Sequence, residues 1–206
     1  MTDVVLWDYP KSSASYRVRI ALNLAGIRYR SEVVNLLDGA HKAPDHLVRN
    51  PQGLVPVLDI DGHRFTQSLA ILDYLDTTRN MGLLPDDPVM RTKAMALAHV
   101  IAVDLHPVCN LSVMRHATGG QEPARTAWMQ HFIRPGLEAF EALLPQFNQS
   151  PFATGDCPGL ADICLIPQLY NATRWGVDFA DLSGIVSIAA ACQMVPAFAN
   201  AYPSDT

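Results

Sequence analysis

Hydrophobic and polar positions at the start of the chain form short runs whose period changes, and this pattern predicts a mixed α/β unit. Residues Val4–Tyr9 are a β-rich run that stops at Pro10, so we expect a first strand there. From Tyr16 the apolar residues follow helical spacing, and Gly26 is a typical helix end. Residues Tyr29–Leu36 predict a second strand, with a connection long enough for a parallel crossover.

The next residues predict a β-hairpin and a helix. The run VPVLDIDGHRF (residues 55–65) has two strand-like pieces on either side of Asp61–Gly62, and a two-residue Asp-Gly loop is a strong hairpin signal. Residues Ser68–Thr78 follow an amphipathic helical pattern, with Ser68 expected as the N-cap. The order β-α-β and then β-β-α is that of a thioredoxin-like domain, a small mixed sheet with helices on both faces.

Strand signals fade after Asn80–Met90, a stretch with two prolines and a glycine that is typical of a linker. Beyond it the chain consists of long helical segments rich in alanine and leucine, at residues 91–108, 124–144, 160–173 and 182–195. We therefore predict a thioredoxin-like domain over residues 1–80, a linker over 81–89 and an all-α domain over 90–206.

Composition narrows the class of protein. Hydrophobic residues make up 49% of the 206 positions and charged residues 17%, which is typical of a globular chain. The net charge of −5 and the lack of a basic run argue against nucleic-acid binding. The sequence has no apolar stretch of about 18 residues and no basic start of a signal peptide, so we expect a soluble cytoplasmic protein without a membrane partner.

The cysteines do not suggest a metal site or a disulfide framework. They stand at Cys109, Cys157, Cys164 and Cys192, without a C-x-x-C pair or a histidine at zinc-finger spacing. Scattered cysteines in a chain of this size are most simply buried thiols in a reducing compartment.

Three serines, Ser12, Ser13 and Ser15, crowd the turn between the first predicted strand and helix. A serine before a helix commonly caps the N–H groups of the first turn. The same N–H groups, together with the positive end of the helix dipole, also suit an anion or a thiolate. These residues by themselves leave both roles open.

Five blocks of sequence resemble, in order and spacing, the zeta class of glutathione transferases, which includes maleylacetoacetate isomerases and bacterial maleylpyruvate isomerases. KSSASYRVRIAL (residues 11–22) is similar to the class signature S-S-C-S-x-R-V-R-I-A-L. The other blocks are NPQGLVPVL (50–58), QSLAILDYL (67–75), DLHPVCNLSV (104–113) and GDCPGLADICLIPQLYNATRWGVDF (155–179). The resemblance implies the glutathione transferase fold, glutathione as cofactor and a homodimer.

The resemblance also implies which residues hold glutathione. Ser12 or Ser13 would donate to the sulfur, with Ser12 favoured and Ser15 expected to cap the helix. Val55 would pair with the cysteinyl backbone, where Val55–Pro56 is either the cis-proline turn of this fold or an ordinary edge proline. The implied set is Ser12, Ser13, Ser15, His41, Val55, Gln67, Ser68, Asp104, His106 and Asn110.

Several of these positions keep a second interpretation. Gln67 and Ser68 precede a helix and suit the γ-glutamyl carboxylate, although a serine there can also be a plain cap. His41 would lie at the glycine end of glutathione, and a lone histidine is more often a surface residue. Asp104 either reaches across a dimer interface or caps a helix.

The substrates of these isomerases are dianions, so cationic side chains are the candidates for binding them. By resemblance Arg174 would bind a carboxylate, and Lys11 would add a second positive charge. Arg17 and Arg19 are two apart and cannot share one helix face, so we assign Arg17 to the site and Arg19 to a salt bridge. The predicted catalytic residues are Ser12, Ser13 and Arg17.

The reaction implied is a cis–trans isomerisation of a maleyl keto acid to its fumaryl isomer in the catabolism of aromatic compounds. It proceeds by reversible addition of a thiolate and consumes no glutathione. Two other functions remain: a general transferase that conjugates or dehalogenates small electrophiles, and a glutathione-binding protein without catalysis. Leu111–Ser112 replace two arginines of one bacterial isomerase type, which weakens the maleylpyruvate assignment.

Two positions depart from the pattern of the class. Ala14 replaces the cysteine of the signature, so any activity that uses that thiol is absent. Gly159 replaces a capping threonine, which should weaken the helix start, and Asp162 at the third helical position would partly compensate through the helix dipole.

Overall fold

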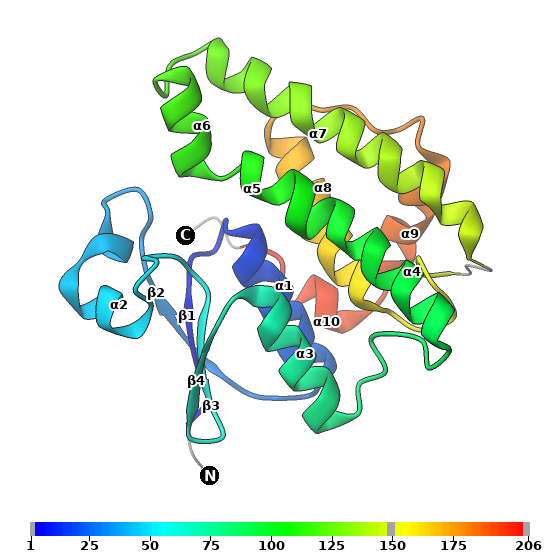
Figure 1. Cartoon of the computed structure of the whole chain (residues 1–206), viewed down its shortest axis with the longest axis horizontal. Helices are drawn as coiled ribbons and strands as arrows, with labels where there is room; N and C mark the ends of the chain where they lie inside the picture. Colours follow the sequence, from blue (N-terminus) through cyan, green and yellow to red (C-terminus); the bar gives the residue numbers. More distant parts are fainter. Residues whose placement is uncertain (1–2, 148–150, 204–206) are drawn as a thin grey trace. The chain divides into compact units, whose positions relative to one another are not determined.

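The computed structural model describes residues 3–147 and 151–203. The chain forms two compact units, Met1–Met81 with Pro196–Thr206, and Gly82–Val195. Figure 1 follows the chain by colour from the mixed α/β unit into the helical unit.

The first unit is built on a four-stranded mixed sheet with the strand order β2-β1-β3-β4. β1 pairs in parallel with β2 and antiparallel with β3, and β3 pairs antiparallel with β4. The parallel pair is the predicted crossover, and the β3–β4 pair is the predicted hairpin around Asp61–Gly62. The strands are β1 (Val5–Asp8), β2 (Arg30–Val33), β3 (Val57–Ile60) and β4 (His63–Thr66).

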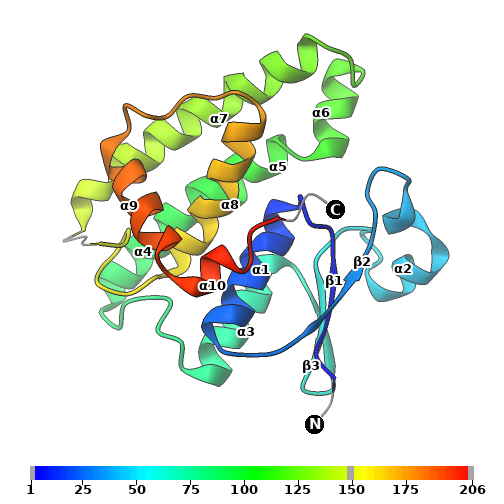
Figure 2. The ribbon, with the colours of Figure 1, turned by 180° about the vertical axis from the view of Figure 1, so that it is seen from behind.

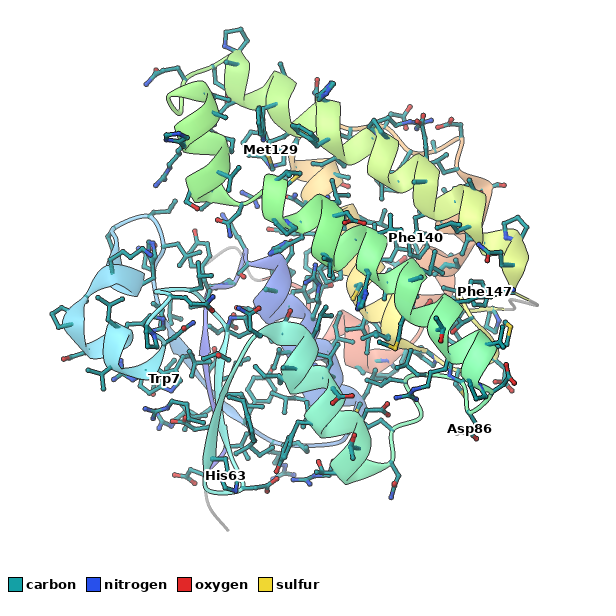
Figure 3. The ribbon with its side chains drawn as sticks, viewed as in Figure 1. Trp7, His63, Asp86, Met129, Phe140 and Phe147 are labelled. Atoms are coloured by element: carbon teal, nitrogen blue, oxygen red, sulfur yellow. The ribbon has the colours of Figure 1, made fainter. Side chains whose placement is uncertain are left out.

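Helices cover both faces of this sheet. α1 and α3 pack against each other on one face, and α2 lies on the opposite face (Figures 1 and 2). Trp7 of β1 points to the α2 side, where the Arg49 guanidinium lies 3.8 Å from the centre of its ring (Figure 3). The predicted thioredoxin-like arrangement is confirmed. The helices of the unit are α1 (Ser13–Leu24), α2 (Pro44–Arg49), α3 (Ser68–Arg79) and α10 (Pro196–Ala199), with a 3₁₀ turn at Ala40–Lys42.

The second unit is all-helical, as predicted. α8 is its central helix: it packs against α4, α7 and α9, and most of its side chains are buried. On α7, the buried Met129 and Phe140 point toward the other helices of the unit (Figure 3). The helices are α4 (Pro88–His99), α5 (His106–Val108), α6 (Leu111–Thr118), α7 (Ala124–Leu143), α8 (Leu160–Arg174) and α9 (Ser183–Gln193), with a π-helical segment at Val100–Leu105 and a 3₁₀ turn at Leu144–Gln146.

The end of the chain departs from the predicted domains. We expected residues 90–206 to form one helical domain, but the segment from Pro196 belongs to the first unit. α10 packs on α1, and the Asn23 side-chain amide donates to the Ala197 carbonyl at 3.0 Å. Composition gives no sign of this return, because it depends on long-range hydrogen bonds to α1.

Within the described parts of the chain, no single helix is both long and apolar enough to cross a membrane. The bent pair Pro88–Val108 and Leu111–Thr118 meets those two criteria together, on length and composition only.

Candidate active site

The serine turn, residues Pro10–Ser13, connects β1 to α1. The Ser12 amide donates to the Tyr9 carbonyl at 2.9 Å, and the Ser12 hydroxyl accepts from the Ser15 amide at 3.3 Å. Ser12 is therefore the N-cap of α1. Because its oxygen accepts this bond, the hydroxyl hydrogen can still be donated to a ligand. Ser12 is also half-buried beside the positive end of the helix dipole, which favours an anion.

The prediction that Ser15 caps α1 is wrong. Helix α1 begins three residues earlier than its apolar pattern indicated, because Ser12 satisfies its first turn. Ser15 thus lies inside the helix with 0% exposure, and its hydroxyl has no hydrogen-bond partner among the described residues. Ser13, the first helical residue, is 8% exposed, whereas Lys11 is exposed.

Arg17 does not face an open site as expected. Its side chain is 1% exposed, and its Nη1 donates to the Ser68 hydroxyl at 3.3 Å. This contact connects α1 to the start of α3. The salt bridge expected of its neighbour is present, since Arg19 Nη1 lies 2.8 Å from the Asp8 carboxylate.

The start of α3 also differs in detail from the prediction. Gln67 rather than Ser68 occupies the N-cap position, and its side chain makes no capping bond. Among the residues that the structure describes, the first-turn N–H groups of Ser68, Leu69 and Ala70 have no acceptor, so they can bind a ligand. Gln67 has a φ of +68°, which is rare outside glycine and asparagine and is often found at ligand-binding turns.

Val55 lies beyond the end of the sheet. The β3–β4 ladder begins at the pair Val57–Thr66, so the Val55 backbone is outside it. The peptide bond between Val55 and Pro56 is cis, which confirms the first of the two interpretations.

Two residues that the sequence did not indicate hold the segment before Val55. Nε2 of the buried His46 and the side-chain amide of the buried Asn50 both contact the Leu54 carbonyl, each at 2.9 Å. Both come from α2 or its C-cap, so α2 fixes the backbone that leads into Val55.

The loop that follows α2 connects three of the predicted glutathione contacts. The Gln67 amide donates to the Gln52 side-chain oxygen at 2.7 Å, and Lys42 Nζ donates to the Gln52 carbonyl at 3.1 Å. A Cβ at Gly53 would lie 2.8 Å from the His41 carbonyl, and Gly53 has a φ of +61°, so glycine is required there. The segments of His41, Val55 and Gln67 are thus brought together, and Gln52 is a contact that no pattern in the sequence indicates.

In the helical unit the predicted residues occupy the segment between α4 and α6. His106 begins α5 and is half-buried, and Asn110 is the N-cap of α6, accepting from the Ser112 amide at 3.3 Å. Asp104 is exposed inside the π-helical segment. The alternative that Asp104 caps a helix is therefore wrong, because no helix begins at it.

Arg174 is the last residue of α8 and is exposed. Its guanidinium lies 5.6 Å from the centre of the Tyr170 ring. Within the described residues no carboxylate pairs with it, so it can take an anion.

An open depression of about 450 Å³ lies near α7, but it does not contain the predicted residues. Its cation, Arg134, already binds both Asp181 carboxylate oxygens at 2.7 Å and the Asp178 carbonyl at 2.9 Å. The hydrogen bond from Arg134 lowers the pKa of Asp181 to about 2. This guanidinium is therefore not available to a dianionic ligand. The lining residues are Gln130, Arg134, Gly176, Val177, Asp178 and Asp181.

Asp162 stabilises the start of α8 more directly than expected. Its two carboxylate oxygens accept from the Ala153 and Gly159 amides at 2.9 and 2.8 Å, and its exposure is 0%. The carboxylate thus satisfies the N-cap amide of Gly159, whereas a threonine side chain at that position would accept from the amides of the first helical turn. Burial raises the pKa of Asp162 to about 6, although the backbone hydrogen bonds act in the opposite direction.

The fold and the serine turn together indicate the class of protein: a thioredoxin-like unit followed by an all-helical unit, with a serine N-cap at the start of α1. Comparison with known proteins agrees with this class. Residues 2–77 match the family model of the glutathione S-transferase N-terminal domain, and residues 122–193 match that of the C-terminal domain.

The relatives narrow the class further. The chain is 55% identical to maleylacetoacetate isomerase of Rhizobium meliloti (strain 1021), over 98% of this chain and 96% of that protein. A solved holo structure of maleyl pyruvate isomerase, described as a bacterial zeta-class glutathione S-transferase, matches with a TM-score of 0.93 and 36% identity over 98% of both chains. Maleylacetoacetate isomerase of Anaeromyxobacter dehalogenans 2CP-1, solved with glutathione in its active site, matches with a TM-score of 0.88 and 34% identity over 99% of this chain and 96% of that one. The chain belongs to the zeta class of the glutathione S-transferase family.

Proposed function

We propose that this protein is a glutathione-dependent cis–trans isomerase that converts a maleyl keto acid to its fumaryl isomer. The observation that carries the proposal is the serine turn, where the N-cap hydroxyl of Ser12 can still donate at the positive end of α1. The relatives named maleylacetoacetate isomerase and maleylpyruvate isomerase support the same reaction.

The polar groups of the first unit fit glutathione. The γ-glutamyl carboxylate needs several donors, and the start of α3 offers the uncapped N–H groups together with the Ser68 hydroxyl. That hydroxyl accepts from Arg17, so its own hydrogen can be donated to a carboxylate. Val55, beyond the end of the ladder, is suited to pair with the cysteinyl backbone. His41 and Gln67 would complete the site from segments held by the loop after α2.

The residues of the serine turn would activate the thiol. Glutathione, when bound, supplies a thiolate that adds reversibly to the cis double bond and leaves a single bond that can rotate. Donation from Ser12, with the helix dipole behind it, lowers the pKa of a thiol at this position. Ser13 would be the second donor, and Ser15 would only supply its amide to the cap. Arg17 is too deeply buried to touch a substrate, so we assign it to the orientation of Ser68.

Arg174 and Lys11 are our candidates for the substrate carboxylates. Both are exposed cations, and a guanidinium binds a carboxylate in bidentate geometry. His106 and Asn110 would offer further hydrogen bonds to glutathione, as the resemblance implies, and the Asn110 side chain keeps its amide hydrogens because only its oxygen is used in capping. Leu111–Ser112 bring no charge at the start of α6, so we favour maleylacetoacetate over maleylpyruvate.

We further propose that the protein is a cytoplasmic homodimer, in which Asp104 serves the partner's glutathione. The homodimer follows from the zeta-class resemblance, and the exposed position of Asp104 is compatible with an intersubunit role. All four cysteines lie in the described part of the chain and are free, which is compatible with a reducing compartment. Three are buried as predicted, but Cys157 is exposed because it lies in the loop before α8. Sedimentation of the purified protein at several concentrations tests the dimer.

The deciding experiment supplies purified protein with maleylacetoacetate and, separately, maleylpyruvate, with and without glutathione. Conversion to the fumaryl isomer only in the presence of glutathione is the expected result. Conjugation of a chlorodinitrobenzene-type electrophile without isomerisation would instead establish the general transferase. Glutathione binding without either reaction would leave a binding protein.

A pair of variants tests the substrate residue. Arg174→Gln should raise the KM for the keto acid about tenfold, the effect of losing a charge-assisted hydrogen bond, and should leave the KM for glutathione unchanged. Arg91→Gln in α4 is the matched control, because it removes an arginine of the same unit that has no proposed role. Equal effects of the two variants would remove Arg174 from the site.

A further inference from the structure

Arg19 makes more contacts than a simple salt bridge requires. Its Nη1 donates to both Asp8 carboxylate oxygens at 2.8 Å, and its Nη2 donates to the Pro10 carbonyl at 2.9 Å. Its Nε donates to the carbonyl of Ala201 at 3.0 Å, 182 residues further along the chain. All of these residues belong to the first unit. One guanidinium thus joins the end of β1, the serine turn and the C-terminal segment.

The position of Arg19 explains how it reaches the turn. It stands seven residues after Ser12, which is two helical turns, and side chains of a helix lean toward its N-terminus. Pro10 belongs to a tight turn that is closed by the bond from the Ser12 amide to the Tyr9 carbonyl. By binding the carbonyl in the middle of this turn, Arg19 fixes the backbone that carries the Ser12 hydroxyl.

Stability alone does not account for this arrangement. Arg19 is 7% exposed and Asp8 is 3% exposed, so the pair is buried. A buried ion pair is seldom more stabilising than apolar residues of the same volume, because desolvation of the charges offsets their attraction. Apolar residues would, however, lose the fixed geometry at the Pro10 and Ala201 carbonyls. The ion pair therefore differs from apolar residues of the same volume in that it holds the Pro10 and Ala201 carbonyls in fixed positions.

We propose that Arg19, held by Asp8 and by the Ala201 carbonyl, is a positioning residue that sets the place of the Ser12 hydroxyl at the glutathione sulfur. This inference rests on the proposed function of the serine turn. Arg19 touches neither glutathione nor substrate, and it acts through the Pro10 carbonyl. The C-terminal segment, including α10 and Ala201, is then part of the scaffold of the catalytic turn.

Two variants disrupt the hydrogen bonds that Arg19 makes to Asp8, Pro10 and Ala201, each in a different way. Arg19→Lys keeps the charge beside Asp8, but its single nitrogen cannot reach Asp8 and both carbonyls from one position. The double variant Asp8→Leu/Arg19→Met removes both charges together, so neither is left buried and unpaired. Asn23→Ala is the control, because it removes a different side-chain bond between α1 and the C-terminal segment, the one to the Ala197 carbonyl, and leaves Arg19 intact.

The readout is the pKa of the bound glutathione thiol, followed through the ultraviolet absorbance of the thiolate as pH rises. The midpoint of this titration does not depend on the amount of folded protein, and thermal unfolding of each variant is recorded beside it. In the unaltered protein we expect a midpoint below the value of about 8.5 for a free cysteine thiol. Both variants should raise it by about one pH unit, which lowers the thiolate fraction and kcat about tenfold well below the midpoint. The KM for glutathione should change little.

The outcomes separate the two proposals. If the unaltered protein lowers the thiol pKa and the two variants keep that value, the positioning role of Arg19 is refuted and the proposed function stands. An equal rise in Asn23→Ala would also refute it, because general loosening of the segment would then suffice. If the unaltered protein does not lower the thiol pKa, the proposed role of the serine turn fails and the role of Arg19 fails with it.

Discussion

Asp162 should make stability depend on pH in the direction opposite to that of an ordinary paired aspartate. Burial raises its pKa from 3.8 to about 6 in the folded protein. Between these two values the folded protein holds a proton that the unfolded chain releases. The contribution of Asp162 to the free energy of unfolding is therefore highest below about pH 4. It falls as pH rises to 6 and is constant above pH 6.

The magnitude follows from the same two values. A rise of about two pH units at 1.36 kcal/mol each gives a loss of about 3 kcal/mol between low pH and neutral pH. The physical reason is that the desolvation of a carboxylate with 0% exposure outweighs the hydrogen bonds it accepts from the backbone amides of Ala153, Gly159 and Asp162 itself. The slope within the window is about 1.4 kcal/mol per pH unit.

The assay compares urea unfolding of the unaltered protein with that of Asp162→Asn from pH 4.5 to pH 8. The amide has nearly the same shape but does not titrate, so the difference between the two free energies of unfolding isolates Asp162. It should decrease up to about pH 6 and then remain level. A difference that grows with pH would refute the reasoning, because the hydrogen bonds would then dominate over desolvation.

A companion variant measures the capping role itself. Asp162→Ala leaves the Ala153 and Gly159 amides buried without acceptors, at a cost of about 1–3 kcal/mol each. We expect a loss of about 3 kcal/mol, because relief of the buried charge offsets part of that cost. For a chain of this size this is a fall of about 6–12 °C in Tm. The exposed Asp156 of the same loop is the control, and Asp156→Ala should stay within about 0.5 kcal/mol.

Three further predictions concern packing and hydrogen bonding. Asn50→Ala, which removes one of the two side chains on the Leu54 carbonyl, should raise the KM for glutathione with little change in kcat, as steady-state kinetics would show. Gly136→Ala should lower stability by about 1–3 kcal/mol in urea unfolding, because the added Cβ would lie 2.7 Å from Leu105 Cδ2; an unchanged midpoint would contradict the tight packing of α7. Gln168→Leu should leave Tm unchanged or raise it, since the buried amide has no partner among the described residues; a clear fall in Tm would count against this.

Local sequence patterns were enough to predict the fold and most of the segments that we propose bind glutathione. The period of the apolar residues set the strands and helices, and the Asp61–Gly62 pair fixed the hairpin, because φ and ψ of short turns are decided by a few neighbouring residues. The blocks around Ser12, Val55 and Ser68 marked the first unit for the same reason. Each is a local feature of a turn or a helix start.

The identity of the N-cap residues of α1 and α3 could be decided only from the structure. Any of the three neighbouring serines could cap a helix, because all three carry the same hydroxyl group. The tight turn at Pro10 makes Ser12 the N-cap and leaves Ser15 buried inside the helix. Similarly, Ser68 became the first helical residue because Gln67 adopts a positive φ before it. In each case the cap is decided by the path of the chain into the helix.

Hydrogen bonds between residues far apart in the sequence depend on the tertiary fold. Nothing in the sequence indicates that Arg17 binds Ser68, that Asn50 supports Leu54, or that Ala201 returns to Arg19. For the same reason, the sequence does not predict that the C-terminal segment returns to the first unit. A polar side chain can form a hydrogen bond with any partner that the fold brings within about 3 Å. Which partner this is cannot be predicted from sequence, because separation along the chain does not determine distance in the folded structure.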